Sequence, residues 1–115
     1  MLTAPLFIVV CADPYKSLWK GKDYSVIDAC LAAEYLILSA MEFGIGSCWI
    51  GAFNEQEVKR ILSIPNHIKV VGIITLGYPD EKPRRYHRNP NEIVFYEEFG
   101  KKYHFKCTDH QNFAD

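Results

Sequence analysis

The sequence predicts a single small domain that mixes strands and helices, and three observations point to it. The chain has 115 residues, which is enough for one hydrophobic core and too few for two. Residues 6–12 and 68–76 are short apolar runs rich in β-branched side chains, a pattern typical of buried strands. Between them lie one long apolar helix pattern and one short amphipathic pattern. We therefore expect residues 1–115 to form one domain, with residues 99–115 as a tail.

Composition and charge exclude several classes of protein. Hydrophobic residues make up 49% of the chain and charged residues 23%, as in ordinary globular proteins. The formal net charge of -1 provides no field that would attract nucleic acid or an anionic membrane. The start, MLTAPLFIVVCADP, lacks the basic region of a secretory signal and is too short to span a bilayer. These features predict a cytoplasmic protein without nucleic-acid or membrane partners.

The first half of the chain is expected to contain a strand and a long helix. Residues 6–12 predict a strand buried on both faces, followed by a loop over residues 15–24. Ser25 is interpreted as a helix N-cap, with Asp28 completing a capping box. The helix is expected to continue to about Phe43, where Gly44 suits the first position after the helix.

The predicted helix over residues 25–43 is apolar on every side. Its only charged residues are Asp28, Glu34 and Glu42, and these are too frequent for a membrane span. A helix of this kind must be covered all round. The rest of the chain is too small to do so, and we expect a symmetric partner, a missing segment or both to supply the cover.

The second half of the chain predicts two more strands and a short helix. Residues 47–50 suit a short strand, and Asn54 is expected to cap a helix that stops before Pro65, with Glu57 at the box position. Residues 68–76 predict a buried strand. Residues 80–92 are interpreted as a polar, basic loop, and a polar tail follows the apolar run at residues 93–96.

The stretch GIGSCWIGAF, residues 44–53, raises the question of why three glycines follow the most apolar helix. A helix cap followed by a tight turn explains the glycine at position 44 and, in part, the one at position 46. It does not explain Gly51, which follows the predicted strand. Glycine there suits a flat ligand lying against the main chain, although the pattern taken alone favours the turn.

Two further clusters are candidates for binding. EKPRRYHR, residues 81–88, places Lys82, Arg84, Arg85 and Arg88 close together, as either a solvated loop or a phosphate site. His104-x-x-Cys107-x-x-His110 offers three zinc-type ligands without an evident fourth, so we predict no metal site and favour a disordered or partner-draped tail.

The four cysteines form no CxxC pair and are interpreted as reduced thiols. Three of them, Cys11, Cys30 and Cys48, lie in apolar runs, which favours packing over nucleophilic chemistry. No acid–base or nucleophilic set stands out, so we predict no catalytic side chain.

Taken in order, these pieces resemble the nitroreductase family of flavin enzymes. The matching segments are APLFIVVCAD, ACLAAEYLILSAMEFGIGSCWIGAF, EQEVKRILSIP, VVGIITLGYPDEKP and R-x-P-x-EIV. The resemblance covers roughly residues 3–98 and corresponds to the C-terminal two thirds of the family. It implies an α+β fold with a central, mostly antiparallel sheet flanked by helices, here truncated at the N-terminus. It also implies a homodimer that buries the long helices and holds FMN at the interface.

The resemblance also implies the residues that hold the cofactor. The backbone N–H of Gly51 would face flavin N5, and Cys48, Trp49 and Ile50 would lie along the ring. Arg88 matches the family's phosphate-binding arginine, whereas Tyr86 stands where the family has a lysine. Arg84 or Arg85 would then supply the missing charge.

The activity implied is that of an FMN-dependent oxidoreductase. NAD(P)H would reduce the flavin, which would then reduce an electron-poor acceptor such as a nitro compound or a quinone. Family members usually carry an N-terminal FMN-binding segment that has no counterpart in this sequence. Two alternatives therefore stay open: a non-catalytic dimerising remnant, and a subunit that completes a flavin site with a separate N-terminal partner.

Overall fold

The computed structural model describes residues 4–17, 20–81 and 88–102. The chain divides into two compact units, Met1–Glu81 and Lys82–Asp115, and each is described by itself. The first unit holds the sheet and the two longer helices. The second holds one short helix and a turn.

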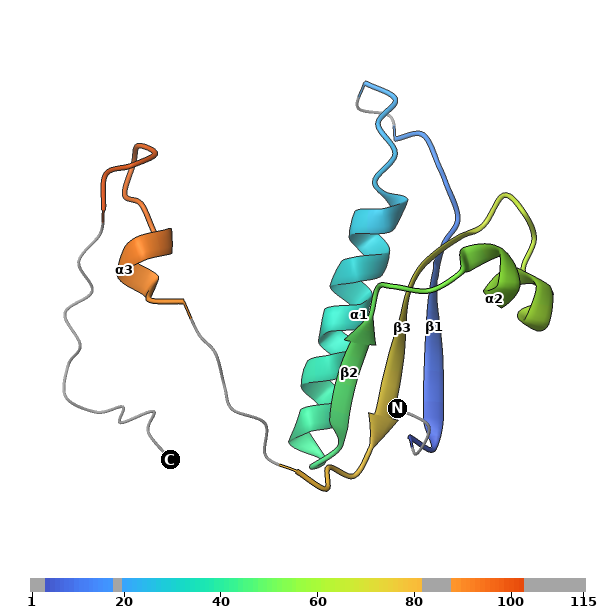
Figure 1. The fold of residues 1–115 in the computed structure, drawn as a ribbon. Helices are drawn as coiled ribbons and strands as arrows, with labels where there is room; N and C mark the ends of the chain where they lie inside the picture. Colours follow the sequence, from blue (N-terminus) through green and yellow to red (C-terminus); the bar gives the residue numbers. More distant parts are fainter. Residues whose placement is uncertain (1–3, 18–19, 82–87, 103–115) are drawn as a thin grey trace. The chain divides into compact units, whose positions relative to one another are not determined.

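The first unit is a three-stranded antiparallel sheet with helix α1 along it (Figure 1). The strands lie in the order β1-β3-β2, so the last strand in sequence is the central one. The α+β class is therefore confirmed. The elements formed by the described residues are β1 (Leu6–Ala12), α1 (Ser25–Glu42), β2 (Gly46–Ile50), α2 (Glu55–Leu62), β3 (Lys69–Gly77) and α3 (Pro90–Ile93).

The core lies between β3 and α1. Ile74 is completely buried and Leu76 nearly so, and both pack with Ala33 of α1. Leu36 and Ile37 are partly buried against the same cluster. The prediction of a buried strand at residues 68–76 is thus confirmed, because β3 has neighbours on both edges and a helix on one face.

The prediction that residues 6–12 are buried on both faces is wrong. β1 lies at an edge of the sheet and pairs with β3 alone. Leu6 and Phe7 are about half exposed, and only Ala12 is buried. A continuous apolar run indicates a strand, but it does not distinguish a central strand from an edge strand whose outer side is open in this chain.

The predicted capping box at the start of α1 is also wrong. The N-cap is Tyr24, which makes no side-chain cap hydrogen bond, and the preceding Asp23 Oδ1 accepts a hydrogen bond of 2.9 Å from the Ser25 N–H. Ser25 is already inside the helix, and Asp28 instead accepts a 2.6 Å hydrogen bond from the Tyr15 hydroxyl. The Ser25 N–H, which the predicted box would pair with the Asp28 carboxylate, thus bonds to Asp23.

The predicted end of α1 is confirmed. Gly44 has a left-handed φ of 71°, and its N–H donates to the Met41 carbonyl oxygen at 3.0 Å. The Ile45 N–H donates to the Ala40 carbonyl oxygen, also at 3.0 Å. This pair of bonds is a Schellman motif, which glycine favours because it has no Cβ.

Helix α2 begins and ends as predicted. The Asn54 side chain accepts a 3.2 Å hydrogen bond from the Glu57 N–H, and the helix ends at Leu62, before Pro65. Ser63 follows it with a left-handed φ of 54°. The short strand predicted at residues 47–50 is present as β2, which begins one residue earlier at Gly46.

The second unit corrects the prediction that residues 80–92 form a loop throughout. Pro90 occupies the first turn of α3, and the Asn89 side chain caps it by accepting a 3.0 Å hydrogen bond from the Asn91 N–H. Proline at the first turn behind a capping asparagine is a helix start signal that the sequence analysis assigned to the loop. Residues 99–102 of the predicted tail belong to a turn in which Phe95 pairs with Lys102.

None of the helices within the described residues is both long enough and apolar enough to cross a membrane.

Candidate functional site

The three glycines of residues 44–53 have different reasons to be glycine. Gly44 needs its left-handed φ for the helix cap. A Cβ on Gly46 would lie 3.3 Å from both the Gly77 carbonyl oxygen and Cβ of Pro79, so glycine permits close packing there. Gly51 has neither reason: its φ is not left-handed, and a Cβ would meet only the Trp49 side chain at an ordinary 3.4 Å. Nothing in the described chain therefore requires glycine at position 51.

The predicted site residues of β2 lie at an edge of the sheet. Cys48 pairs with Thr75 and Ile50 with Ile73 on the neighbouring strand. Because side chains alternate along a strand, Cys48 and Ile50 point to one face and Trp49 to the other. A flat molecule could follow the backbone edge of all three residues, but it could not rest on all three side chains at once.

Trp49 lies across Gly72 of β3. A Cβ on Gly72 would come within 2.1 Å of the Trp49 ring, so this ring position requires glycine beneath it. Beside the ring is a cavity of about 310 Å³ lined by Trp49 and residues of α1, including Cys30 and Glu34. The sequence analysis missed Gly72, although a glycine inside a buried strand is itself a signal of close approach.

The expectation that the cysteines are packed in apolar surroundings is wrong within this chain. Cys11, Cys30 and Cys48 are all free and all exposed. Cys11 lies on the edge strand β1 and Cys30 on α1, so their exposure follows from the uncovered sides of those elements. Cys107 lies outside the described residues.

Of the predicted phosphate-binding residues, only Arg88 can be placed, and its side chain is exposed. Arg88 belongs to the second unit, whereas Gly51 belongs to the first. Tyr86 lies outside the described residues, as do Lys82, Arg84 and Arg85. The same holds for the His104, Cys107 and His110 motif. Within the described ranges, no three acidic, histidine or cysteine side chains are arranged to hold a metal ion.

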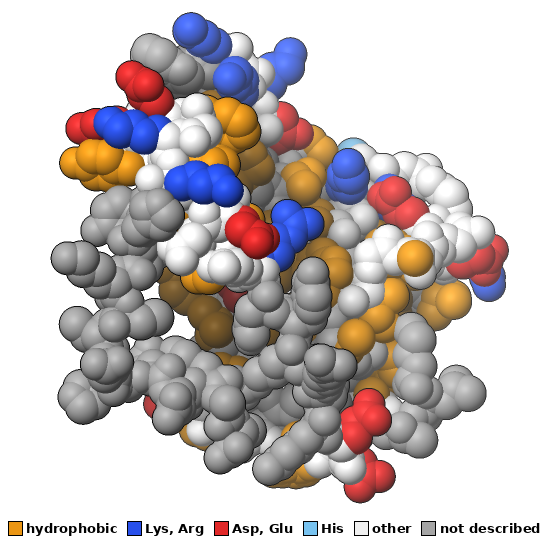
Figure 2. Space-filling model, turned by 60° about the vertical axis from the view of Figure 1, so that its left-hand side comes forward, with side chains coloured by type: hydrophobic (Ala, Val, Ile, Leu, Met, Phe, Trp, Pro, Cys, Tyr) orange, Lys and Arg blue, Asp and Glu red, His pale blue; other side chains and the backbone are white. Residues whose placement is uncertain are grey.

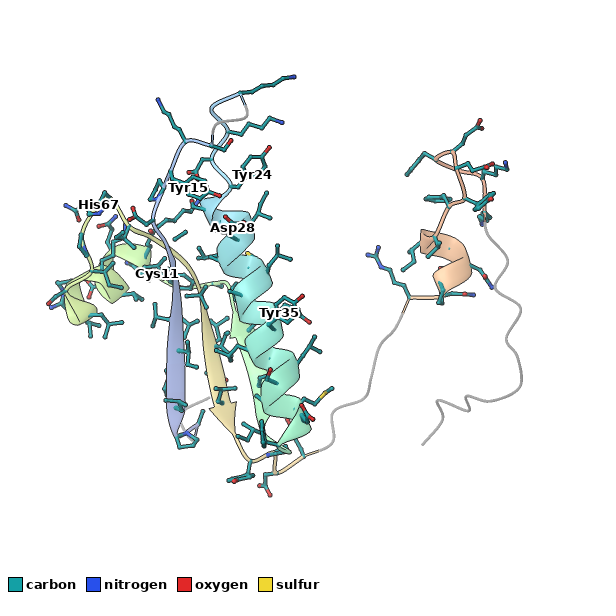
Figure 3. All side chains as sticks on the ribbon, turned by 180° about the vertical axis from the view of Figure 1, so that it is seen from behind. Cys11, Tyr15, Tyr24, Asp28, Tyr35 and His67 are labelled. Atoms are coloured by element: carbon teal, nitrogen blue, oxygen red, sulfur yellow. The ribbon has the colours of Figure 1, made fainter. Side chains whose placement is uncertain are left out.

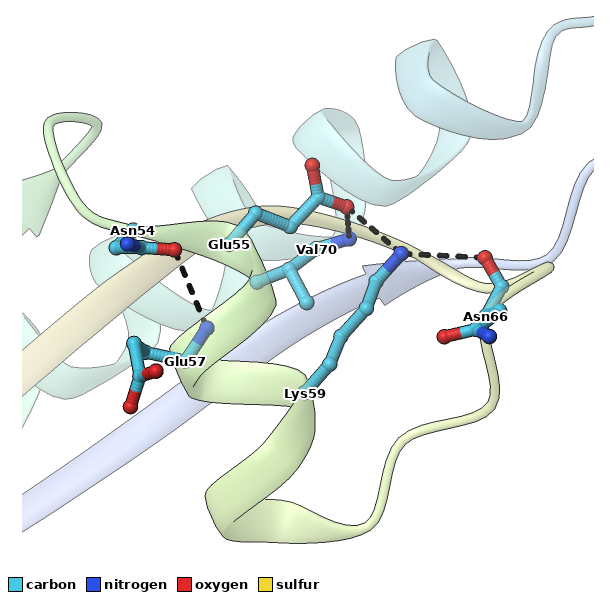
Figure 4. A network of polar contacts seen from close by, with 6 residues as sticks. All are labelled: Asn54, Glu55, Glu57, Lys59, Asn66 and Val70. Atoms are coloured by element: carbon cyan, nitrogen blue, oxygen red, sulfur yellow. Dashed lines mark hydrogen bonds and ion pairs between the residues drawn. The ribbon is translucent and has the colours of Figure 1, made fainter.

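A polar network that the sequence did not predict joins α2 to β3 (Figure 4). Glu55 accepts a 3.1 Å hydrogen bond from the Val70 N–H and lies 3.1 Å from the Lys59 ammonium. Lys59, whose side chain is only 9% exposed, also donates a 3.2 Å hydrogen bond to the Asn66 carbonyl oxygen. Two hydrogen bonds lower the pKa of the Glu55 carboxyl: the one from the Val70 N–H has the larger effect, and the one from Lys59 the next largest.

The outer side of α1 is apolar and uncovered within this chain. Tyr35 is 74% exposed and Met41 65% exposed, and Tyr35 projects outward from the helix (Figure 3). On the face of the molecule drawn in Figure 2, hydrophobic side chains reach the surface among charged ones. We define the outer face of α1 by its exposed large apolar residues, Ile27, Leu31, Tyr35, Leu38 and Met41. The first unit by itself thus leaves this face of its long helix uncovered, as the sequence led us to expect.

The N-terminal end of α1 carries a further polar pair. The Tyr15 hydroxyl donates a hydrogen bond of 2.6 Å to Asp28 Oδ2, and this bond raises the pKa of Tyr15 (Figure 3). The pair ties the loop after β1 to the first turns of α1. It explains locally why Asp28 is not free to act in a capping box.

The chain resembles known proteins in both sequence and structure. It matches the family model described as "Nitroreductase family" over residues 1–78. It is 37% identical over 88 residues to a Thermus thermophilus protein named NADH dehydrogenase, a match covering 76% of this chain and 40% of that protein.

Two solved structures of Clostridium difficile proteins have the same fold. One, described as a nitroreductase family protein, gives a TM-score of 0.74 at 28% identity and covers 84% of this chain and 61% of that chain. The other is described as an FMN-dependent nitroreductase. It gives a TM-score of 0.69 at 33% identity, with 84% of this chain and 59% of that chain covered.

The chain is shorter than the proteins it matches. It spans less than half the length of the curated relatives, for example 43% and 45% of two archaeal ones.

Proposed function

The chain belongs to the nitroreductase family, and from that premise we propose that it serves an FMN-dependent oxidoreductase that uses NAD(P)H to reduce an electron-poor acceptor. A nitro compound or a quinone is the expected class of acceptor. The observation that carries the proposal is Gly51, a glycine at the end of the edge strand β2 that neither backbone conformation nor internal packing requires. A cofactor ring lying against the backbone supplies the missing reason.

The residues of the segment fit such a ring. Apart from its two chain neighbours, a Cβ at position 51 would meet only the Trp49 side chain within 4 Å, so the described residues leave the main chain open to close approach at that point. We assign the Gly51 N–H as the donor to flavin N5 and the edge of Cys48, Trp49 and Ile50 as the border of the ring. FMN, when bound, supplies the electron transfer between NAD(P)H and the acceptor. The chain holds the ring in place and offers a backbone donor whose protonation does not change with pH.

The phosphate end of the cofactor is assigned to the basic segment. Arg88 is exposed, and the planar guanidinium of arginine binds phosphate through two parallel hydrogen bonds. Tyr86 occupies the position where the family has a lysine, and we assign the compensating charge to Arg84 or Arg85.

We propose a homodimer that buries the outer face of α1 against its symmetry mate. The exposed side chains on this face are large and apolar, and uncharged interface cores of this kind are typical of permanent dimers. The flavin would then lie beside the interface. Three described cysteines are free, which fits a cytoplasmic enzyme in a reducing compartment.

The test is a titration of the purified chain with FMN, followed by visible absorbance, together with the mass of the chain in solution. We expect a yellow dimer. Arg88→Ala should weaken FMN binding by about tenfold or more, because a charged hydrogen bond contributes roughly 1.5–3 kcal/mol. Arg60→Ala is the matched control, since Arg60 is an exposed arginine paired with Glu57 on α2.

Two further variants separate the ring from the interface. Gly51→Val should abolish FMN binding and leave the dimer intact, whereas Tyr35→Lys should shift the mass toward the monomer. A colourless dimer that ignores FMN would indicate a dimerising remnant without flavin. A second polypeptide that co-purifies and restores the colour would indicate a subunit that shares its flavin site with a partner.

A further inference from the structure

The connection between β2 and α2, residues 51–54, is attached to β3 at both of its ends. At the first end, Ile50 pairs with Ile73 in the antiparallel ladder. At the second end, Glu55 accepts the hydrogen bond from the Val70 N–H. Both attachments are to the same strand, which is the most buried one in the sheet.

The second attachment is built with more contacts than a surface ion pair. The same Glu55 oxygen, Oε1, receives both the Val70 N–H and the Lys59 ammonium, each at 3.1 Å (Figure 4). Lys59 is buried and also donates a hydrogen bond of 3.2 Å to the Asn66 carbonyl oxygen. The first turn of α2, its second turn and the α2–β3 connection are thus joined through one carboxylate. Breaking this arrangement would leave the buried Lys59 ammonium without its carboxylate partner and the Val70 N–H without this acceptor, which is costly.

We infer that Glu55 is a positioning residue for the flavin site: it clamps the start of α2 to β3 and so holds the Gly51 N–H in a fixed direction. The inference rests on the proposed function of Gly51. With the clamp in place, the backbone order of residues 51–54 is established before the cofactor arrives. Without it, binding must order the segment, and the affinity falls accordingly.

Glu57 provides a matched control for Glu55. It lies in the same first turn of α2, but its carboxylate pairs with the exposed Arg60 side chain. Its hydrogen bond to the Asn54 side chain is donated by the backbone N–H, which an alanine at position 57 would retain. Glu55→Ala removes the clamp, whereas Glu57→Ala removes a surface pair of the same helix. Glu55→Gln retains an oxygen that can accept the Val70 N–H, so it should restore most of the effect.

The first readout is the backbone order parameter of the Gly51 N–H, measured by NMR relaxation on the full chain without flavin. We expect about 0.85 in the wild type, Glu55→Gln and Glu57→Ala, and a value below about 0.6 in Glu55→Ala. If Glu55→Ala does not fold, Glu55→Ala combined with Lys59→Met is used, because that variant leaves no buried ammonium. An unchanged order parameter in the variant that folds overturns the inference.

The second readout is the FMN dissociation constant of the same proteins. Fixing the backbone of one residue carries an entropic cost equivalent to about 5- to 30-fold in affinity, and we expect a loss of that size in Glu55→Ala only. If the wild type binds no FMN while the order parameter still falls in Glu55→Ala, the proposed function fails and the clamp stands. If FMN binds and neither readout changes in Glu55→Ala, the clamp fails and the proposed function stands.

Discussion

Replacement of Gly72 by alanine should destabilise the chain by displacing Trp49. The new Cβ would lie 2.1 Å from Cζ2 of the ring, whereas ordinary contacts begin near 3.4 Å, so the ring must retreat by more than about 1 Å. Overpacking of this kind costs roughly 1–3 kcal/mol in unfolding free energy. The ring is already 41% exposed and can move outward, which makes the lower half of that range the expected value.

The assay is urea unfolding at fixed protein concentration, combined with tryptophan emission in a Trp19→Phe background. Gly72→Ala should lower the unfolding free energy and shift the Trp49 emission to the red, because the displaced ring meets more water. Gly51→Ala is the control, because its Cβ would have room. Alanine also lowers the conformational entropy of the unfolded chain, so the stability should stay unchanged or rise by up to about 1 kcal/mol. A Gly72→Ala protein as stable as the wild type, with unchanged emission, would refute the placement of the ring over Gly72.

Three further predictions concern the caps and the clamp. Asn54→Ala removes the acceptor for the Glu57 N–H and should lower the unfolding free energy in the same urea assay by about 1 kcal/mol; an unchanged value would contradict the cap. Gly44→Ala places a Cβ at a φ of 71° and should cost about 1–2 kcal/mol, measured in the same urea assay; no loss would mean that the helix ends differently. The lowered pKa of Glu55 stabilises the fold above its ordinary value of 4.5, and this contribution disappears as the pH falls through the lowered pKa. The melting temperature of the wild type should therefore fall more steeply below about pH 4.5 than that of Glu55→Gln, and parallel curves would contradict the role of the carboxylate.

Local patterns predicted the elements well, because each depended on neighbours in sequence. The Schellman end at Gly44 and the cap at Asn54 follow from chemistry within a few residues, and both are confirmed. The capping box at Ser25 failed for an equally local reason, since Asp23 offered a competing acceptor. Where two side chains can accept a hydrogen bond from the same backbone N–H, the sequence is compatible with both, and only the structure shows which one does.

Long-range features were out of reach of such patterns. The apolar run at residues 6–12 indicated a strand, but its place at the edge of the sheet depends on the order β1-β3-β2. The Glu55 clamp joins residues that are adjacent only after α2 folds back on β3, and neither Glu55 nor Val70 carries a motif. A glutamate in the first turn of a helix is ordinarily explained by the helix dipole alone.

The candidate site shows why a glycine is informative only once its internal reasons have been examined. Gly72 lies within a buried strand, where a glycine also indicates close approach, and the Trp49 ring fills the space above it. Gly51 follows the edge strand β2, where a helix cap and a tight turn do not explain it. Among the described residues, the Trp49 ring accounts for Gly72, whereas nothing accounts for Gly51. A ligand is therefore to be sought at the glycine that the fold does not need.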